Sequence, residues 1–309
     1  MPGPMMRAVR IHDYGGVEAL VLEEAPRPEP QADQILVRVR AAGVNPADGA
    51  MRAGAFRQFM PLQMPWTPGL EGAGVVEAVG SAVTAFPPGQ EVFGLVIGGY
   101  AEYAVANAKE MHFKPAGLTM EEAASVPMGA LMAWGAVVET AKVEAGQAVL
   151  IHGAAGGVGS YATQLAHWKG AYVMGTTAAA NLAFVRSLGA QMAIDYTGAP
   201  FERVVQDVDV VVDTVGGDMQ ARSMSVLQPG GIFVTVAGRP APDAGKALGI
   251  RVVSAGRPDA TKLGPISELL AAKTIVPTIR AVFPLAEAGK AQDLCATQHG
   301  RGRIILSVP

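Results

Sequence analysis

Residues 148–166 read AVLIHGAAGGVGSYATQLA, an apolar strand followed by a glycine-rich turn and a helix. Gly153, Gly156 and Gly159 recur at three-residue intervals, where the missing Cβ lets a backbone turn sharply, approach a pyrophosphate or pack a helix against a sheet. Another apolar strand follows at 171–174, which is the context a dinucleotide-binding turn requires. The amides at the turn and the positive end of the helix dipole would then face the phosphates. The predicted phosphate-binding residues are Gly153, Ala155, Gly156, Gly157, Val158 and Gly159.

The composition is that of a globular protein of about two domains. Of the 309 residues, 50% are hydrophobic and 17% are charged, and no apolar run is long enough to cross a bilayer. The start, MPGPMMRAVR, lacks the features of a signal peptide, and the single cysteine, Cys295, cannot form an internal disulfide. We therefore expect a cytoplasmic protein. The net charge of −3, with no basic block, argues against nucleic acid as a partner.

The secondary-structure pattern of the sequence changes near residue 119. Residues 7–114 contain short β-rich runs separated by Pro and Gly, which predict a compact β-barrel with strands at 7–11, 35–40, 74–79, 91–95 and 101–105. From Thr119, which precedes Glu121 and Glu122 as a helix cap, strands and helices alternate and predict a parallel, doubly wound sheet. Its expected strands are 149–151, 172–174, 192–194, 208–212, 232–236 and 250–254, followed by a helix at 265–273. Residues 281–309 again show the β-rich pattern of residues 7–114, so we expect the chain to return to its first domain.

Motifs spread over nearly the whole chain resemble those of the medium-chain dehydrogenase/reductase superfamily, within it the zinc-independent quinone oxidoreductase branch that includes the zeta-crystallins. They are AAGVNPADGAMRAG at 41–54, PGLEGAGVVEAVG at 68–80, GGYAEYAV at 98–105, HGAAGGVG at 152–159, DTVGG at 213–217 and GRIILSV at 302–308. The resemblance implies an α/β fold: a GroES-like β-barrel domain (1–121 with 275–309) plus a Rossmann doubly wound parallel sheet (122–274). It also implies an active-site cleft where the two domains meet, and a homodimer.

The residues at the family's zinc positions are not a zinc-ligand set. In the zinc-dependent relatives a cysteine stands where this chain has Asn45, and a histidine followed by glutamate stands at Leu70 and Glu71. The lobe that holds structural zinc with four cysteines is also missing, because Cys295 is the only cysteine. We expect no metal. Without a Lewis acid to polarise an alcohol, hydride transfer favours reduction of a quinone or an activated, enone-type double bond.

The end of the second strand of the sheet bears on the choice of cofactor. An NAD-selective site places an acid there, whereas this strand ends in Gly175, Thr176 and Thr177, and the next acid is Asp195. NADPH is therefore favoured, with Tyr196 and the two threonine hydroxyls as expected partners of the 2′-phosphate. The relatives' basic residue is missing from the turn, so we expect only a modest preference over NADH. Further expected cofactor contacts are Val215, Ala237, Gly238 and Arg303.

The proton donor is left open by the sequence. Some relatives carry a tyrosine just after the position of Gly54, where this chain has Ala55 and Phe56, so protonation is assigned to water, Asn45 or Tyr100. The expected apolar substrate pocket comprises Phe56, Phe59, Met60, Met64, Trp66 and Met132. We interpret His152 as structural, Asp48 and Glu71 as hydrogen-bonding braces, and Cys295 as a buried small hydrophobe.

Three functional hypotheses remain after these observations. The first is an NADPH-dependent reductase of a small apolar quinone or enone, which the nucleotide turn and the replaced zinc ligands favour. The second is an alcohol or carbonyl dehydrogenase, which needs a metal or a strong acid–base pair. The third is a nucleotide-binding, crystallin-like protein with little catalysis.

Overall fold

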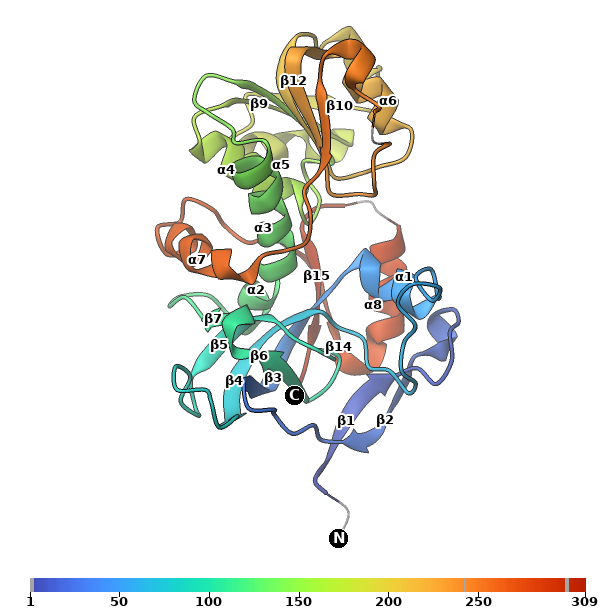
Figure 1. Cartoon of the computed structure of the whole chain (residues 1–309), viewed down its shortest axis with the longest axis vertical. Helices are drawn as coiled ribbons and strands as arrows, with labels where there is room; N and C mark the ends of the chain where they lie inside the picture. The colour runs from blue at the N-terminus through green and yellow to red at the C-terminus, as the bar shows by residue number, and fades with distance from the viewer. Residues whose placement is uncertain (1–2, 242, 298–299) are drawn as a thin grey trace.

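A computed structural model describes residues 3–241, 243–297 and 300–309, and two sheets lie along its long axis (Figure 1). The upper lobe contains a six-stranded, all-parallel sheet in the order β10-β9-β8-β11-β12-β13. Its strands are β8 (Ala148–His152), β9 (Tyr172–Thr177), β10 (Met192–Asp195), β11 (Val208–Asp213), β12 (Leu227–Thr235) and β13 (Arg251–Ser254). All six strands were predicted, with ends that shift by a few residues.

The central strands of this sheet are apolar because helices cover both of its faces. In β8 and β11 the runs VLI and VVV are buried almost completely, as expected for parallel strands without a solvent face. The sheet is packed by α3 (Pro127–Trp134), α4 (Gly159–Trp168), α5 (Leu182–Ser187), α6 (Met219–Met224) and α7 (Leu263–Ala271). The strand order reverses between β8 and β11, so the turns that follow these two strands open a crevice at the sheet's carboxyl edge.

The lower lobe is built on a seven-stranded sheet in the order β14-β15-β3-β4-β5-β7, with β6 also paired to β3. These strands are β3 (Gln34–Val44), β4 (Glu71–Val79), β5 (Glu91–Leu95), β6 (Tyr103–Asn107), β7 (Met111–Phe113), β14 (Ile279–Pro284) and β15 (Arg303–Ser307). A separate two-stranded sheet joins β1 (Met5–Arg10) to β2 (Val21–Pro26). This lobe also carries α1 (Pro46–Arg52) and α8 (Ala288–Ala296).

The C-terminal segment enters the first sheet, as the sequence indicated. β15 pairs antiparallel with β3, and β14 pairs parallel with β15. The helix α2 (Met120–Ala124) begins at the Thr119–Glu122 capping box and packs on the lower sheet, so it crosses the predicted boundary at 121/122. The domain limits therefore stay a prediction, while the expected α/β class, with a β-sheet lobe and a doubly wound parallel sheet, is confirmed.

Candidate active site

A cavity of about 420 Å³ lies between the two lobes, at the carboxyl edge of the upper sheet. One wall is formed by the turns after β8, β11 and β12, and the opposite wall by the start of α1 and the returning C-terminal segment. Of the residues predicted from the sequence, the cavity is lined by Asn45, Met132, Gly153, Gly156, Gly157, Val158, Val215, Ala237 and Arg303. Residues widely separated in the chain therefore meet at one site.

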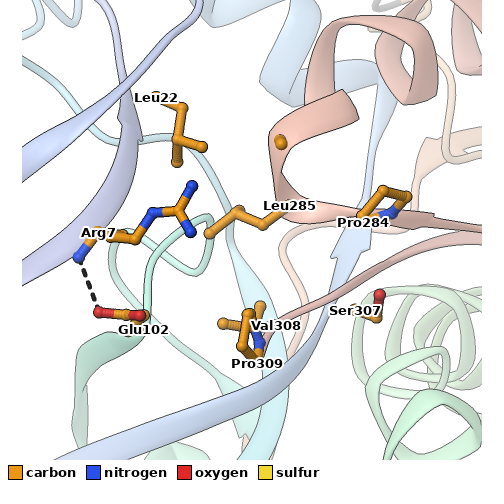
Figure 2. A pocket seen from close by; sticks show the side chains of 9 residues that line it. Arg7, Leu22, Glu102, Pro284, Leu285, Ser307, Val308 and Pro309 are labelled. Atoms are coloured by element: carbon orange, nitrogen blue, oxygen red, sulfur yellow. Dashed lines mark hydrogen bonds between the residues drawn. The ribbon is translucent and has the colours of Figure 1, made fainter.

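A second cavity, of about 290 Å³, is shown in Figure 2, and none of these residues lines it. It is bordered by Arg7, Leu22, Glu102, Leu285 and the C-terminal Val308 and Pro309, and the Arg7 backbone N–H donates to Glu102 Oε2 at 2.8 Å. None of the predicted cofactor, catalytic or pocket residues reaches it. The cavity between the lobes is therefore the candidate active site.

The glycine turn has the geometry that its three glycines require. Gly153 has φ +69°, in the left-handed region. A Cβ on Gly159 would lie 2.1 Å from the carbonyl oxygen of Gly153, so helix and strand can approach only with glycine there. A Cβ on Gly156 would meet only that same oxygen, at 3.2 Å, and would otherwise project into open space.

The turn offers fewer free amides than the sequence suggested. The Gly156 N–H donates to the carbonyl oxygen of Gly153 at 2.8 Å and is not available to a ligand, which corrects our expectation for this amide. The N–H groups of Gly157 and Val158 have no acceptor among the described residues. These two amides, at the start of α4, form the unsatisfied edge of the turn.

Asn45 is held in the opposite wall by an ion pair. Its Nδ2 donates to Glu71 Oε1 at 2.8 Å, and its Oδ1 accepts from Arg303 Nη2 at 2.9 Å. Arg303 also forms a short, buried ion pair with Glu71, whose other oxygen accepts the Met128 N–H at 2.7 Å. Glu71 is thus a brace, as predicted.

This arrangement determines which way the Asn45 amide points. A carboxylate only accepts and a guanidinium only donates, so the nitrogen must face Glu71 and the oxygen must face Arg303. One N–H of Nδ2 remains after the bond to Glu71, and Asn45 lines the cavity. The residue can therefore present a fixed hydrogen-bond donor to a ligand.

Arg303 links this cluster to the glycine turn. Its Cδ lies 2.8 Å from the position that a Cβ on Gly157 would occupy, so glycine is needed for the side chain to pass. Its Nε is buried without a hydrogen-bond partner among the described residues. An unsatisfied guanidinium nitrogen beside two free amides is a site suited to a phosphate.

Asp48 braces the same turn from behind. Its Oδ2 accepts the Asn45 backbone N–H at 2.8 Å and the Tyr100 hydroxyl at 3.2 Å, while Oδ1 is buried without a partner among the described residues. Burial, more than any other cause, raises the pKa of Asp48 from 3.8 to about 7. The brace predicted from the sequence is confirmed.

Tyr100 was one of the candidate proton donors, and its position argues against that role. Its side chain is completely buried, its hydroxyl is committed to Asp48, and it does not line the cavity. Burial and the neighbouring Asp48 raise the pKa of the hydroxyl well above its usual value. The structure brings Asn45, but not Tyr100, to the cavity.

The end of β9 differs from our expectation for the 2′-phosphate. The Thr176 hydroxyl accepts from the Gly153 N–H at 3.3 Å and lies 3.0 Å from His152 Nδ1, inside the domain, and Thr177 is buried as well. Thr176 therefore does not present its hydroxyl to a ligand. Tyr196, by contrast, is 48% exposed.

His152 is structural, as interpreted from the sequence. The ring is buried between Thr176 and Ser223, whose Oγ lies 2.9 Å from Nε2, and it packs edge-on against Phe201. Desolvation lowers the pKa of His152 to about 4, so the imidazole is neutral at physiological pH.

A cation beside α5, the helix that follows β9, comes from a distant segment that sequence reasoning missed. The Gly302 N–H donates to the carbonyl oxygen of Ala155 at 2.8 Å, which attaches the C-terminal segment to the glycine turn. The Arg301 guanidinium lies 5.4 Å from the ring centre of Phe184, in α5, which follows the turn after β9. Local sequence around that turn gave no signal for it.

Most of the expected substrate pocket lies elsewhere. Phe56, Phe59 and Met60 are exposed, by 38%, 80% and 50%. None of these three lines the cavity, and neither do Met64 and Trp66; Trp66 instead forms a β-bridge with Ile11. Only Met132 is placed as predicted. Only the apolar composition of this Pro-rich loop indicated a pocket, and composition does not predict where a loop lies relative to the cavity.

Cys295 and Arg280 line the cavity although the sequence gave them no such place. Cys295 is on α8, half-buried, with Sγ 3.9 Å from the carbonyl oxygen of Val44, and burial raises the pKa of the thiol. Within the described ranges, no group of three or more His, Cys, Asp or Glu side chains is placed to hold a metal ion. In the same ranges, no helix is long and apolar enough to cross a membrane.

A Rossmann sheet joined to a barrel-like lobe, with a cavity at its glycine turn, defines a two-domain, dinucleotide-dependent oxidoreductase. Comparison with protein families agrees: residues 31–116 match the alcohol dehydrogenase GroES-like domain, and residues 188–306 match the zinc-binding dehydrogenase family. The chain belongs to the medium-chain dehydrogenase/reductase superfamily, in its quinone oxidoreductase branch.

Several relatives cover almost the whole chain. An NADPH-dependent alkenal/one oxidoreductase from chloroplasts of Arabidopsis thaliana is 35% identical over 97% of this chain and 79% of its own length. A quinone oxidoreductase of Mus musculus is 31% identical over 98% of both chains. The structure of a quinone oxidoreductase from Coxiella burnetii superposes with a TM-score of 0.93 at 31% identity, covering 99% of this chain and 100% of that one.

Proposed function

We propose that this protein is an NADPH-dependent reductase that transfers hydride to a quinone or to the double bond of an enone. The observation that carries the proposal is the oriented Asn45 amide, which lines the same cavity as the glycine turn and keeps one N–H that Glu71 does not use. Relatives described as a quinone oxidoreductase and as an alkenal/one oxidoreductase support the same substrate class.

The residues around the turn fit a dinucleotide. The free amides of Gly157 and Val158 and the unpartnered Nε of Arg303 would hold the pyrophosphate, and the open space beside Gly156 admits it. Val215 and Ala237, on the turns after β11 and β12, would line the rest of the cofactor's path. When bound, the cofactor would supply the hydride.

Asn45 would act on the substrate's carbonyl oxygen. As hydride reaches the β-carbon, negative charge develops on this oxygen, and a donor already held in position stabilises that charge without reorganising. The guanidinium of Arg303 donates to the oxygen of the same amide and so places a positive charge beside it. Apolar neighbours such as Met132 keep the carbonyl in a low-dielectric environment.

Protonation of the product is assigned to solvent. The described residues that line the cavity include no acid and no histidine or tyrosine, and the raised pKa makes the Cys295 thiol a poor donor. A quinone reduced by hydride gives a hydroquinone anion, and an enone gives an enolate, both of which water can protonate.

The preference for NADPH belongs to the same proposal. The turn after β9 contains no acid of its own. Asp195, which pairs with Thr177 across β9 and β10, is engaged by the N–H and hydroxyl of Thr197, and Arg301 places a cation on Phe184 of α5, the helix after that turn. We propose Tyr196 and Arg301 as the partners of the 2′-phosphate, in place of the buried Thr176.

We also propose zinc-independent activity, a homodimer and a cytoplasmic location, with domains at 1–121 plus 275–309 and at 122–274. Asn45 in place of a zinc-binding cysteine supports zinc-independent activity. The strand β13, whose outer edge has no partner among the described residues, supports a homodimer. The single, free cysteine supports a cytoplasmic location.

A paired assay tests the proposal. NADPH and NADH oxidation would be followed with 1,4-benzoquinone, an enone and an aldehyde. The reverse reaction, reduction of NADP⁺ or NAD⁺, would be followed with a simple alcohol. Each assay would be run with and without a chelator. We expect NADPH oxidation with the quinone or enone, unaffected by the chelator. Activity confined to the alcohol after metal addition would support a dehydrogenase, and nucleotide binding without turnover would support a crystallin-like protein.

A further inference from the structure

Arg280, on β14, lines the candidate active site without a carboxylate partner among the described residues. Its Nη1 makes only two long contacts, each of 3.4 Å, to the carbonyl oxygen of Leu294 and to Thr297 Oγ1. Its Nε and Nη2 donate no hydrogen bond to any described residue. Within the described part of the chain, most of this half-buried guanidinium therefore has no hydrogen-bond partner.

The charge of the cavity makes this arginine unusual. The protein carries 27 acids against 24 Lys and Arg residues, yet the described residues lining the cavity include two arginines and no acid. Glu71 neutralises Arg303, whereas no carboxylate of the described residues forms an ion pair with Arg280. A half-buried cation without a counter-ion is costly, and an anion arriving in the cavity would remove that cost.

The position of Arg280 favours the substrate over the cofactor as the source of that anion. Its guanidinium contacts the end of α8, on the same stretch as Cys295, and packs beneath Gly300. The free amides and the unpartnered Arg303 nitrogen, which suit the pyrophosphate, lie at the glycine turn. Although Arg280 is next to the ladder partner of Arg303, its guanidinium is held at the end of α8, whereas the Arg303 side chain reaches the glycine turn.

We propose that Arg280 binds a carboxylate of the substrate, so that the preferred substrates are enones or quinones with an acidic side chain. This inference rests on the proposed function and names its substrate class. The planar fork of a guanidinium matches a carboxylate through two parallel hydrogen bonds, which Nε and Nη2 can donate. The reacting carbonyl would lie at Asn45, with the acidic tail directed to Arg280.

The test compares two compounds that differ only in charge. A vinyl ketone whose alkyl chain ends in a carboxylate has the same reacting group as its methyl ester, and a short series of chain lengths covers the unknown reach. We expect the parent to prefer the best acid over its ester by about tenfold in kcat/KM, the effect of one charge-assisted hydrogen-bonded pair. Arg280→Ala should abolish that preference by lowering kcat/KM for the acid about tenfold more than for the ester, and Arg280→Lys should restore part of it.

Binding measurements separate this inference from the proposed function. The saturated ketone acid and ester would be titrated by calorimetry into the NADP⁺ complex of the parent, Arg280→Ala and Arg203→Ala, in which an exposed arginine of the upper lobe is removed as a matched control. Tighter binding of the acid in the parent and in the control, lost only in Arg280→Ala, supports the subsite even if turnover fails. Equal binding of acid and ester by the parent would overturn it. So would weaker NADPH binding in Arg280→Ala with an unchanged acid-to-ester ratio, which would assign Arg280 to the cofactor.

Discussion

At the scale of single residues, the account depends on one amide whose orientation is imposed from both sides. Glu71 and Arg303 are themselves an ion pair, and Asn45 inserts its nitrogen toward one and its oxygen toward the other. Neither partner can exchange roles, because one has only acceptors and the other only donors. The direction of the remaining N–H is therefore fixed before a ligand binds, and we propose that the substrate accepts from it.

Replacing Asn45 by alanine should lower kcat for the quinone or enone by about a hundredfold, because a donor to developing charge is lost. The Kd of NADPH, measured by fluorescence titration, should change little. Tyr100→Phe is the matched control: it removes a buried hydroxyl that contacts Asp48, so kcat should stay near the parent value. An Asn45→Ala enzyme with unchanged kcat, or a Tyr100→Phe enzyme as slow as Asn45→Ala, would contradict the assignment.

Asp48 should make stability depend on pH. Because burial raises its pKa from 3.8 to about 7, the folded protein keeps a proton that the unfolded chain releases. The stability due to this proton is complete below a pH of about 4 and is lost as the pH rises toward the folded-state pKa. Relative to Asp48→Asn, the parent's free energy of unfolding should fall across that window, by at most about 1.4 kcal/mol per pH unit, and level off above it. Urea titrations at several pH values measure this, and a constant difference would refute it.

At the scale of elements, the glycines of the turn between β8 and α4 serve different purposes. Gly156→Val should leave the fold intact, since a Cβ there meets only one oxygen at 3.2 Å, but its branches would occupy the proposed pyrophosphate site. We expect NADPH affinity to fall by at least about tenfold, with little change in Tm. Gly159→Val should instead lower Tm sharply, because its Cβ would meet the Gly153 carbonyl at 2.1 Å. Calorimetric titration and thermal unfolding distinguish the two; nucleotide binding as tight as the parent's in Gly156→Val would show that the site is misplaced.

The turn after β9 should gain its cation from the C-terminal segment. Arg301→Ala is expected to weaken binding of 2′,5′-ADP by about tenfold, because a charge-assisted hydrogen bond is lost, and to leave 5′-AMP unchanged. Arg203→Ala removes an exposed arginine that does not line the cavity, and it should alter the binding of neither nucleotide. If Arg301→Ala binds both nucleotides as the parent does, the 2′-phosphate lies elsewhere.

The sequence predicted elements better than it predicted side-chain directions. All six strands of the upper sheet, the Thr119 cap and the return of the C-terminus follow from periodicity and capping chemistry. Whether Thr176 faces a ligand or His152 depends on the packing between β9 and β8, which a strand pattern does not contain. Arg280 and Arg301 reach their places through pairing of β14 and β15 with the first sheet, so the local sequence carries no signal for them.

At the scale of the whole molecule, the site exists only because the C-terminal segment returns. β15 brings Arg303 to Glu71 of β4 and to the glycine turn of the other lobe, and α8 and β14 complete the wall with Cys295 and Arg280. The buried ion pair of the lower lobe therefore borders the glycine turn of the upper lobe, and the two lobes share one cavity. The proposed chemistry needs both, since the hydride donor binds one lobe and the substrate's carbonyl is held by the other.

Isotope tracing tests the central claim most directly. With NADPH deuterated at the transferable position of the nicotinamide and an enone substrate, the account predicts deuterium at the product's β-carbon by NMR. With unlabelled NADPH in D₂O, it predicts deuterium at the α-carbon, because solvent protonates the enolate. Deuterium from the cofactor at the carbonyl carbon, giving an alcohol, would instead show a carbonyl reductase and contradict the proposed function.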